Sequence, residues 1–134
     1  MDAVVVDTDV ISFVFKKDSR ARLYRRHLVG KQGLMSFMTL AELDWWALRS
    51  GWGAARKRKL QRFLVQFTMI PFDRRLCQHW ADATQEARLA GRPIQCADAW
   101  IAATALQINA PLLTNNPTDN AGVSGLAVLS STSP

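Results

Sequence analysis

Three acidic side chains fall at similar places along the chain, each near the point where a helix is expected to begin. Asp7 directly follows the apolar run Val4-Val5-Val6. Glu42 lies just after a second apolar run, and Asp98 lies near the start of an alanine-rich helix. Carboxylates held close together raise one another's pKa, and a cation relieves that repulsion. Mg²⁺ or Mn²⁺ suits an all-oxygen site, and the set therefore predicts metal-assisted phosphodiester hydrolysis.

Each of these carboxylates also has an ordinary structural explanation. Thr8 or Asp9 can cap the helix that follows the first strand. The segment 39–42, Thr-Leu-Ala-Glu, fits a capping box in which the glutamate only accepts a backbone N–H. Asp98 can cap its own helix. The joint pattern favours a site, because strand ends and the helix starts that follow them share one edge of a parallel sheet.

The elements that must position these side chains alternate between strands and helices. Buried strands are expected at 4–6, 34–38, 68–72, 111–114 and 126–129. Helices are expected from Thr8 or Asp9, from Ser19 to His27, and over 39–49, 54–67, the stretch between Asp73 and Gly91, and 97–109. Residues 115–125 are typical of a loop. The alternation predicts a mainly parallel sheet flanked by helices, in one domain over 1–134 with a frayed tail from about residue 130.

Composition narrows the class of protein. The 134 residues are 49% hydrophobic, and no apolar run approaches the roughly 18 residues that span a membrane. Residues 1–3 lack the positive start of a signal peptide. Cys77, Cys96, His27 and His79 are isolated, which argues against zinc and for reduced thiols in a cytoplasm. The net charge is +6 with clustered basic residues, which favours a polyanionic partner, most often nucleic acid.

Two surface features have two interpretations each. The basic residues around the fourth predicted helix form either a rail for RNA phosphates or an ordinary solvated face; they are Arg49, Arg56, Lys57, Arg58 and Lys59. Three tryptophans crowd the preceding segment, at Trp45, Trp46 and Trp52. Because adjacent residues of a helix point in different directions, at least one of these rings should face a groove or a partner, while core packing is the default for another.

Four segments in order carry a family resemblance: VVVDTDVIS, TLAEL, GRPIQCADAWIAATAL and LLTNNPTDNAGVSGLAVL. With them the chain resembles PIN-domain ribonucleases of the VapC toxin type. The resemblance implies a PIN-like three-layer α/β/α sandwich and a cytoplasmic endoribonuclease, a hydrolase that uses Mg²⁺ or Mn²⁺. It also implies cleavage of a structured cellular RNA (tRNA, rRNA or mRNA), inhibited translation, a homodimer, and a cognate VapB-type antitoxin. An antitoxin helix could bind a groove near the tryptophans.

Carried over residue by residue, the family's acids fall on Asp7, Glu42 and Asp98. The resemblance makes Asp7 and Asp98 the main metal ligands, while Glu42 completes the site or helps to activate water. Asp9 stands where many members have asparagine, so we expect it to be a helix cap and an extra negative charge at the edge of the site.

The closing segment departs from the family pattern. The fourth acidic position falls near Asn116, which is neutral and is expected to hold a water or an RNA phosphate. Asp119 either compensates from the loop or is a plain turn residue, and Thr114 lies close enough to contribute a hydroxyl. Asn120 replaces the usual aromatic residue.

Two other functions compete with a nuclease. A haloacid-dehalogenase-like phosphatase also begins with an apolar strand and D-x-D, here residues 7–9, with Asp7 as the nucleophile, but its downstream lysine motif is missing. A non-catalytic RNA-binding or regulatory PIN-like protein with a decayed acidic site is favoured only by Asn116.

Overall fold

A five-stranded parallel sheet forms the centre of the part of the chain that the computed structural model describes, residues 2–131. The strand order is β3-β2-β1-β4-β5, and all four neighbouring pairs are parallel. The strands are β1 (Ala3–Val6), β2 (Gln32–Ser36), β3 (Thr68–Ile70), β4 (Leu112–Leu113) and β5 (Val128–Leu129). The predicted mainly parallel sheet is therefore confirmed, with β1 at its centre.

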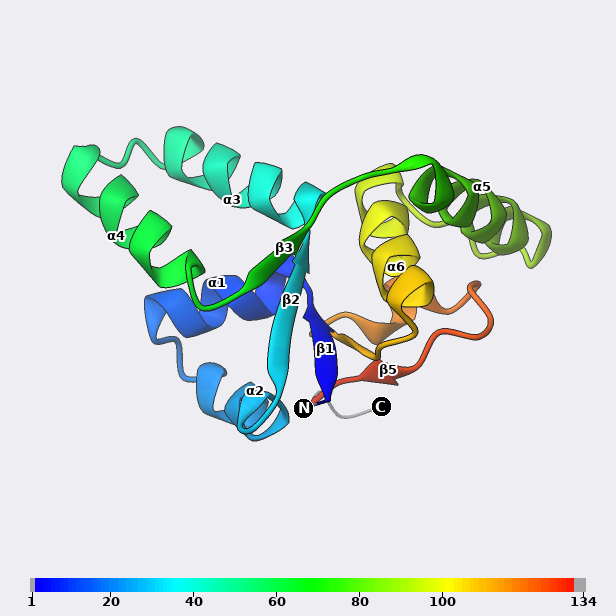
Figure 1. The fold of residues 1–134 in the computed structure, drawn as a ribbon, viewed down its shortest axis with the longest axis horizontal. Helices are drawn as coiled ribbons and strands as arrows, with labels where there is room; N and C mark the ends of the chain where they lie inside the picture. Colours follow the sequence, from blue (N-terminus) through cyan, green and yellow to red (C-terminus); the bar gives the residue numbers. More distant parts are fainter. Residues whose placement is uncertain (1, 132–134) are drawn as a thin grey trace.

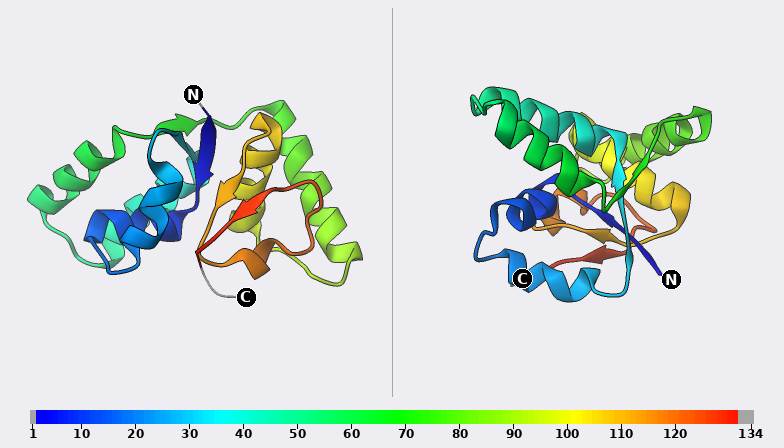
Figure 2. Two further views of the ribbon diagram at one scale, coloured as in Figure 1. Left: turned by 90° about the horizontal axis from the view of Figure 1, so that it is seen from below. Right: turned by 60° about the vertical axis from the view of Figure 1, so that its left-hand side comes forward.

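Helices cover both faces of this sheet, as Figures 1 and 2 show. On one side lie α1 (Thr8–Lys16), α2 (Ala21–Leu28), α3 (Phe37–Arg49) and α4 (Ala54–Leu64). On the other side lie α6 (Cys96–Ile108), which packs on the strands, and α5 (Arg74–Leu89), which packs on α6. A short 3₁₀ helix, η1 (Pro117–Asn120), interrupts the predicted loop. The α/β/α sandwich is thus confirmed. Within residues 2–131, no helix combines the length and apolar character needed to cross a membrane.

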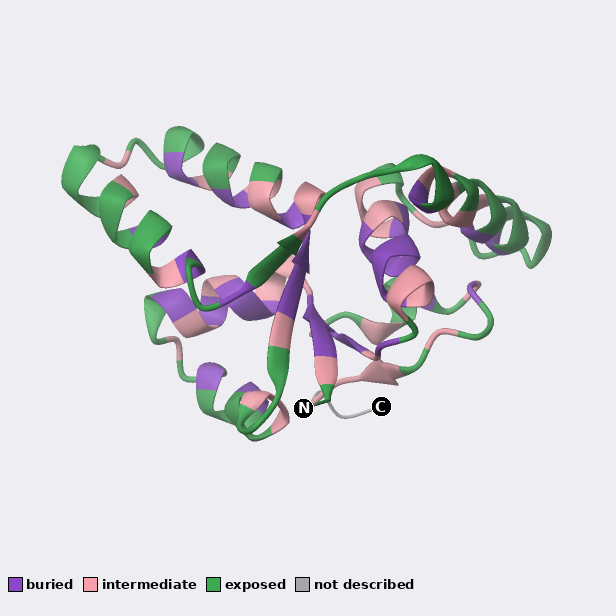
Figure 3. Cartoon of the chain, viewed as in Figure 1, coloured by how far each residue is buried: buried purple, intermediate pink, exposed green. Residues whose placement is uncertain are grey.

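The buried run in β1 follows from this layering, because neither face of the strand meets water. Val4 and Val6 pack among the core residues of α1 to α4, whereas Val5 points the other way and packs with Ile101 of α6. The three valines are at most 1% exposed, and Figure 3 shows the central strands as the buried part of the sheet. The buried β1 therefore fixes the position of Asp7, which directly follows it.

The caps of the first two helices differ from the predictions. The N-cap of α1 is Asp7 itself, whose Oδ1 accepts the Thr8 N–H at 2.7 Å, so neither Thr8 nor Asp9 is the cap. Strand β1 ends at Val6, as predicted, and the next residue takes the cap. Ser19 does not cap α2, which begins at Ala21; Asp18 instead accepts the Arg20 N–H at 2.9 Å in the preceding turn.

The predicted capping box at 39–42 is wrong. Helix α3 begins at Phe37, and its cap is the buried Ser36, whose Oγ accepts the Met38 N–H at 3.0 Å. A serine at the end of β2 can cap directly, so the strand stops two residues before its predicted end and Glu42 is left free of any capping role.

Asp98 does not cap its helix either. Helix α6 begins at Cys96 after Gln95, and Asp98 lies inside its first turn. Asp73 does cap α5, as predicted, with Oδ1 accepting the Leu76 N–H at 2.8 Å. Smaller differences are boundaries: α4 ends at Leu64, and β3 ends at Ile70.

Part of the expected frayed tail, residues 132–134, lies outside the described residues. Within them, the Ser131 hydroxyl donates to the Leu23 carbonyl at 2.8 Å and lies 3.3 Å from His27 Nε2. The chain end that follows β5 is therefore held against α2.

Gly122 should be intolerant of a side chain. A Cβ there would lie 2.7 Å from the Arg92 carbonyl oxygen and 2.9 Å from Ala87 Cα, both backbone atoms that cannot rotate away. We expect Gly122→Ala to lower the free energy of unfolding by about 1 to 3 kcal/mol, measured by urea denaturation. Gly53→Ala is the control, because a Cβ there meets nothing within 4 Å. Equal stability of the two variants would contradict this prediction.

Candidate active site

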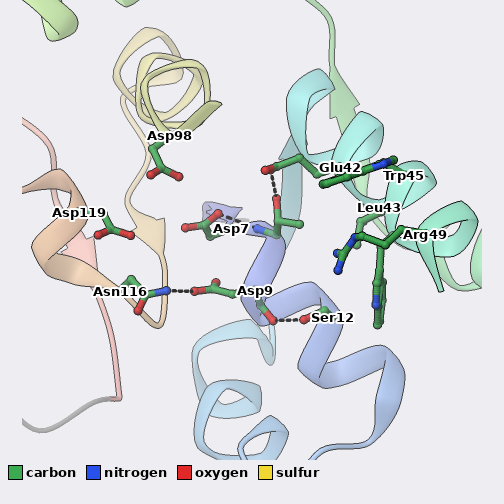
Figure 4. Close-up of a pocket in the computed structure, with 12 residues that line it drawn as sticks. Asp7, Asp9, Ser12, Glu42, Leu43, Trp45, Arg49, Asp98, Asn116 and Asp119 are labelled. Carbon is green, nitrogen blue, oxygen red and sulfur yellow. Dashed lines mark hydrogen bonds between the residues drawn. The ribbon is translucent and has the colours of Figure 1, made fainter. Parts of the chain in front are cut away.

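A cavity of about 320 Å³ opens where the carboxyl end of β1 meets the starts of three helices. It collects acidic side chains from widely separated parts of the chain, as Figure 4 shows. Asp7 and Asp9 come from the start of α1, Glu42 from α3 and Asp98 from α6. The topology therefore brings together the three carboxylates that the sequence singled out. Strand β1 leads into α1 and lies beside β2, which leads into α3, while α6 packs against both β1 and β2.

Asp7 lies at the centre of the cavity and is held by two hydrogen bonds. Its Oδ1 accepts the Thr8 N–H at 2.7 Å, and its Oδ2 accepts the Thr114 hydroxyl at 2.8 Å. Burial, together with the nearby charge of Asp9, raises the pKa of Asp7 to about 7 despite these bonds. At neutral pH this carboxyl is therefore poised between its charged and neutral forms.

Glu42 faces Asp7 from the opposite wall, and a network of threonines fixes its position. The Thr8 hydroxyl donates to Glu42 Oε1 at 2.7 Å. The buried Thr39 places its own hydroxyl oxygen 3.0 Å from that of Thr8. One carboxylate oxygen of Glu42 is thus oriented by the start of α1, which leaves the other available to a bound group.

Asp98 lies across the cavity from Glu42, next to Asp119 of η1 (Figure 4). Burial raises the pKa of Asp98 to about 6, and the charges of Asp7, Asp119 and Glu42 add to the effect in that order. The structure therefore brings Asp119 to the rim of the acidic group. The acidic neighbours thus add to the effect of burial on the pKa of Asp98, and a nearby cation would oppose that rise.

Asp9 connects the start of α1 to the loop that follows β4. Its Oδ2 accepts the Asn115 N–H at 3.1 Å and the Asn116 side-chain amide at 3.0 Å, while its Oδ1 accepts the Val10 N–H at 2.6 Å. The Asn116 N–H in turn donates to the Thr114 hydroxyl oxygen at 3.1 Å. Burial raises the pKa of Asp9 against the pull of these bonds. Asp9 thus lines the cavity and also anchors the loop that follows β4.

The remaining predicted residues lie at the rim of the cavity or beyond it. Trp45 is 62% exposed and lines the cavity with Arg49, whose guanidinium lies 4.7 Å from the centre of its ring. Trp46 also lines the cavity, but it and Trp52 pack against Phe15. The basic residues of α4 do not line the cavity; they are Arg56, Lys57, Arg58 and Lys59.

A family model described as PIN domain matches residues 4–118. The chain belongs to the PIN domain family. It is 29% identical over 114 residues to Ribonuclease VapC1 of Haemophilus influenzae strain R2866, a match that covers 84% of this chain and 85% of the relative. The structure of VapBC-1 from nontypeable Haemophilus influenzae superposes with a TM-score of 0.85 at 25% identity and covers 98% of this chain and 99% of that one. VapBC2 from Rickettsia felis, bound to a DNA fragment from its promoter, has the same fold, with a TM-score of 0.83 at 23% identity and coverage of 96% and 98%.

Several residues of this PIN domain site were not singled out from the sequence for chemistry. Thr8 orients Glu42, and Asn115 contacts Asp9 through its N–H. Ser12 lines the cavity and donates its hydroxyl to the Asp9 carbonyl at 2.6 Å. Their positions in the sequence could have indicated two of these residues, because Thr8 lies between two acids and Asn115 lies between Thr114 and Asn116.

The donor set of the PIN domain cavity fits a hydrated divalent cation. Within residues 2–131, no group of three or more Asp, Glu, His or Cys side chains stands ready to enclose a metal ion. Mg²⁺ does not need such a cage, because it keeps several waters and takes one or two carboxylates. Asp7 and Asp98 would supply carboxylate ligands, and a bound cation would offset the cost of ionising them, because burial and then the charges of acidic neighbours raise the pKa of both. The absence of a lysine among the residues lining the cavity argues against the phosphatase alternative.

Proposed function

We propose that this PIN domain is a metal-dependent endoribonuclease that hydrolyses phosphodiester bonds of a structured cellular RNA and so inhibits translation. The observation that carries the proposal is the convergence of Asp7, Glu42 and Asp98 on one cavity in a member of this family. The similarity to a protein named Ribonuclease VapC1 supports the activity. The similarity to the VapBC-1 structure supports a toxin that binds a VapB-type antitoxin. The proposal also includes a cytoplasmic location and a homodimer.

Different residues at the cavity would have different roles in this reaction. Asp7 and Asp98 would hold Mg²⁺ or Mn²⁺, which when bound supplies a water of lowered pKa and stabilises charge on the phosphate. Thr114 and the Thr8 N–H hold Asp7 in one orientation. Glu42, with one oxygen on the Thr8 hydroxyl, has its other oxygen free to accept a proton from the attacking water.

Purified protein incubated with total cellular RNA tests the proposal. We expect discrete RNA fragments in the presence of Mg²⁺ or Mn²⁺, seen on a denaturing gel, and none after EDTA is added. Cleavage that survives EDTA, or that requires no carboxylate of the cavity, would sink the proposal. Sequencing of the fragment ends would then identify the RNA.

The Thr114 hydroxyl should matter more for catalysis than for folding. It donates to Asp7 and accepts the Asn116 N–H, so Thr114→Val leaves both partners short of a hydrogen bond. We expect about a tenfold loss of kcat, consistent with 1 to 2 kcal/mol for a buried bond to a charged group. Thr114→Ser keeps the hydroxyl and should restore most of the rate. A serine variant as slow as the valine variant would show that packing is responsible instead.

A further inference from the structure

A second cavity of about 310 Å³ adjoins the candidate active site, and none of the roles proposed above involves it. Its walls are the α5–α6 turn, the start of α6 and η1, and it shares Asp98 and Asp119 with the first cavity. Arg92 lines this second cavity together with Gln95 and Thr118. The two cavities thus meet at a pair of carboxylates, and only the second contains Arg92.

The two connected cavities hold many acids and few cations. Among the residues that line them, the acids are Asp7, Asp9, Glu42, Asp98 and Asp119, and the cations are Arg49 and Arg92. An RNA backbone is a polyanion and is repelled by such a lining unless cations hold it. The two arginines are therefore the only cationic side chains of the lining that can offset this repulsion.

The arginines lie on opposite sides of the acidic group. Figure 4 shows Arg49 and Trp45 on one side of Asp7, and Asp98 and Asp119 on the other, where the second cavity begins. The segment that carries Arg92 joins α5 to α6, across the sheet from α3, which carries Arg49 (Figure 1). A chain of phosphates that passes over the acids would meet one arginine before them and one after.

The backbone of Arg92 is held more firmly than that of an ordinary surface arginine. Its N–H donates to the Ala87 carbonyl at 2.9 Å, and Gly122 packs closely against its carbonyl oxygen. Pro93 restricts the backbone from the following position. No ion pair within residues 2–131 uses Arg92, so its guanidinium is available to a ligand.

We propose that Arg92 is a phosphate-binding residue for the RNA substrate, and that one RNA strand crosses the acidic group with flanking phosphates on Arg49 and Arg92. This inference rests on the proposed nuclease function. A guanidinium presents a planar fork of N–H donors that matches a phosphate. Such contacts fix the register of the backbone without reading its sequence. Arg92 therefore contributes to binding of the RNA backbone through a flanking phosphate and does not take part in the chemistry.

Salt-dependent binding tests the role of Arg92. The probe is a short fluorescein-labelled single-stranded RNA of mixed sequence, with Ca²⁺ in place of Mg²⁺, followed by fluorescence anisotropy. We expect Arg92→Gln to weaken binding about fivefold. The plot of log affinity against log salt should become shallower by about 0.7, the value for one lost phosphate contact on a single strand. Arg92→Lys should keep the slope because it keeps the charge.

Arg88→Gln is the matched control, because Arg88 lies four residues earlier, at the end of α5, and lines neither cavity. An Arg92→Gln variant with the affinity and slope of Arg88→Gln would overturn the inference. In cleavage assays, Arg92→Gln should raise KM and leave kcat unchanged, which a merely structural role would not do. A fall in kcat with no change in KM would also count against a binding role.

Neutral phosphates in the substrate locate the contact. Once the cleavage site is mapped, a methylphosphonate can replace each phosphate beside it in turn. A methylphosphonate on one side of the cleavage site should not weaken RNA binding by Arg92→Gln any further. One on the other side should not weaken binding by Arg49→Gln any further. If both variants lose sensitivity on the same side, the two-sided path is wrong.

The two proposals fail in different ways. If the wild-type protein cuts RNA but Arg92→Gln does not change the salt slope, the nuclease proposal stands and the phosphate-binding role of Arg92 is wrong. If the wild-type protein cuts no RNA but Arg92→Gln weakens RNA binding and lowers the salt slope, the phosphate-binding role of Arg92 stands and the nuclease proposal is wrong.

Discussion

Replacing Asp7 by asparagine should lower the rate of RNA cleavage by about 1000-fold, and Asp98→Asn should do the same. The physical reason is loss of charge at unchanged shape: asparagine can still accept the Thr8 N–H, but it is a poor ligand for Mg²⁺. A metal contribution of about 4 kcal/mol to transition-state stabilisation corresponds to this factor. Initial rates on a fluorogenic RNA in saturating Mg²⁺ provide the measurement.

Asp82→Asn is the matched control for this experiment. Asp82 is an exposed carboxylate on α5 and lines none of the cavities around the site. Its replacement removes one negative charge from the protein and should leave the rate within about twofold, as expected for a surface position. If Asp7→Asn and Asp82→Asn behaved alike, the cavity would not be the active site.

The same Asp7→Asn variant should be more stable than the wild type when divalent cations are absent, and the gap should widen as the pH rises. Asp7 has a pKa of about 7 in the folded protein, against 3.8 for an unperturbed side chain. Between these values the folded protein keeps a proton that the unfolded chain has released. The stability gained from that proton is complete below about pH 4 and is lost as the pH rises through 7.

Asparagine carries no such proton, so it escapes this loss. We expect equal free energies of unfolding near about pH 4 and a gap of about 2 kcal/mol near about pH 8. The full shift would correspond to about 4 kcal/mol, which we reduce because Asp7 is only half-buried. Urea denaturation in EDTA at several pH values is the measurement. Saturating Mg²⁺ should reverse the order of stability, and a gap independent of pH would contradict the prediction.

The loss of activity and the gain of stability expected for Asp7→Asn have one physical cause, which is the negative charge of Asp7. Residues that are useful for chemistry destabilise the empty site, and the surrounding fold tolerates them because it is anchored elsewhere. Asp7 is held by Thr8 and Thr114, and its strand is buried on both faces. A bound cation would offset the cost that burial and the neighbouring charges impose on the ionised Asp7.

The sequence by itself determined the layered fold and the central acids. A run of valines that carries no polar alternation is compatible with a strand covered on both faces, and β1 is such a strand. Parallel strands place their ends at one edge, so Asp7, Glu42 and Asp98 were predictable as neighbours. These inferences rest on periodicity and topology, which local sequence carries directly.

Only the tertiary structure decided which side chains serve these acids. The capping box at 39–42 was a sound local pattern, but Ser36 lies one turn earlier and takes the cap, which releases Glu42 to Thr8. The contact between Asp9 and Asn116 joins residues 107 positions apart. Such pairings depend on how β4 and η1 settle beside α1, and no local propensity encodes them.

The same reason separates the two arginines from the rest of the basic residues. Arg56, Arg58 and their neighbours form the densest positive run in the sequence, yet they lie on α4, outside the cavity. Arg92 is one of many arginines in the sequence, and it gains its position from Gly122 and Ala87, which the fold brings beside it. Charge density can be read along a chain, whereas proximity to a phosphate path is a property of the packed molecule.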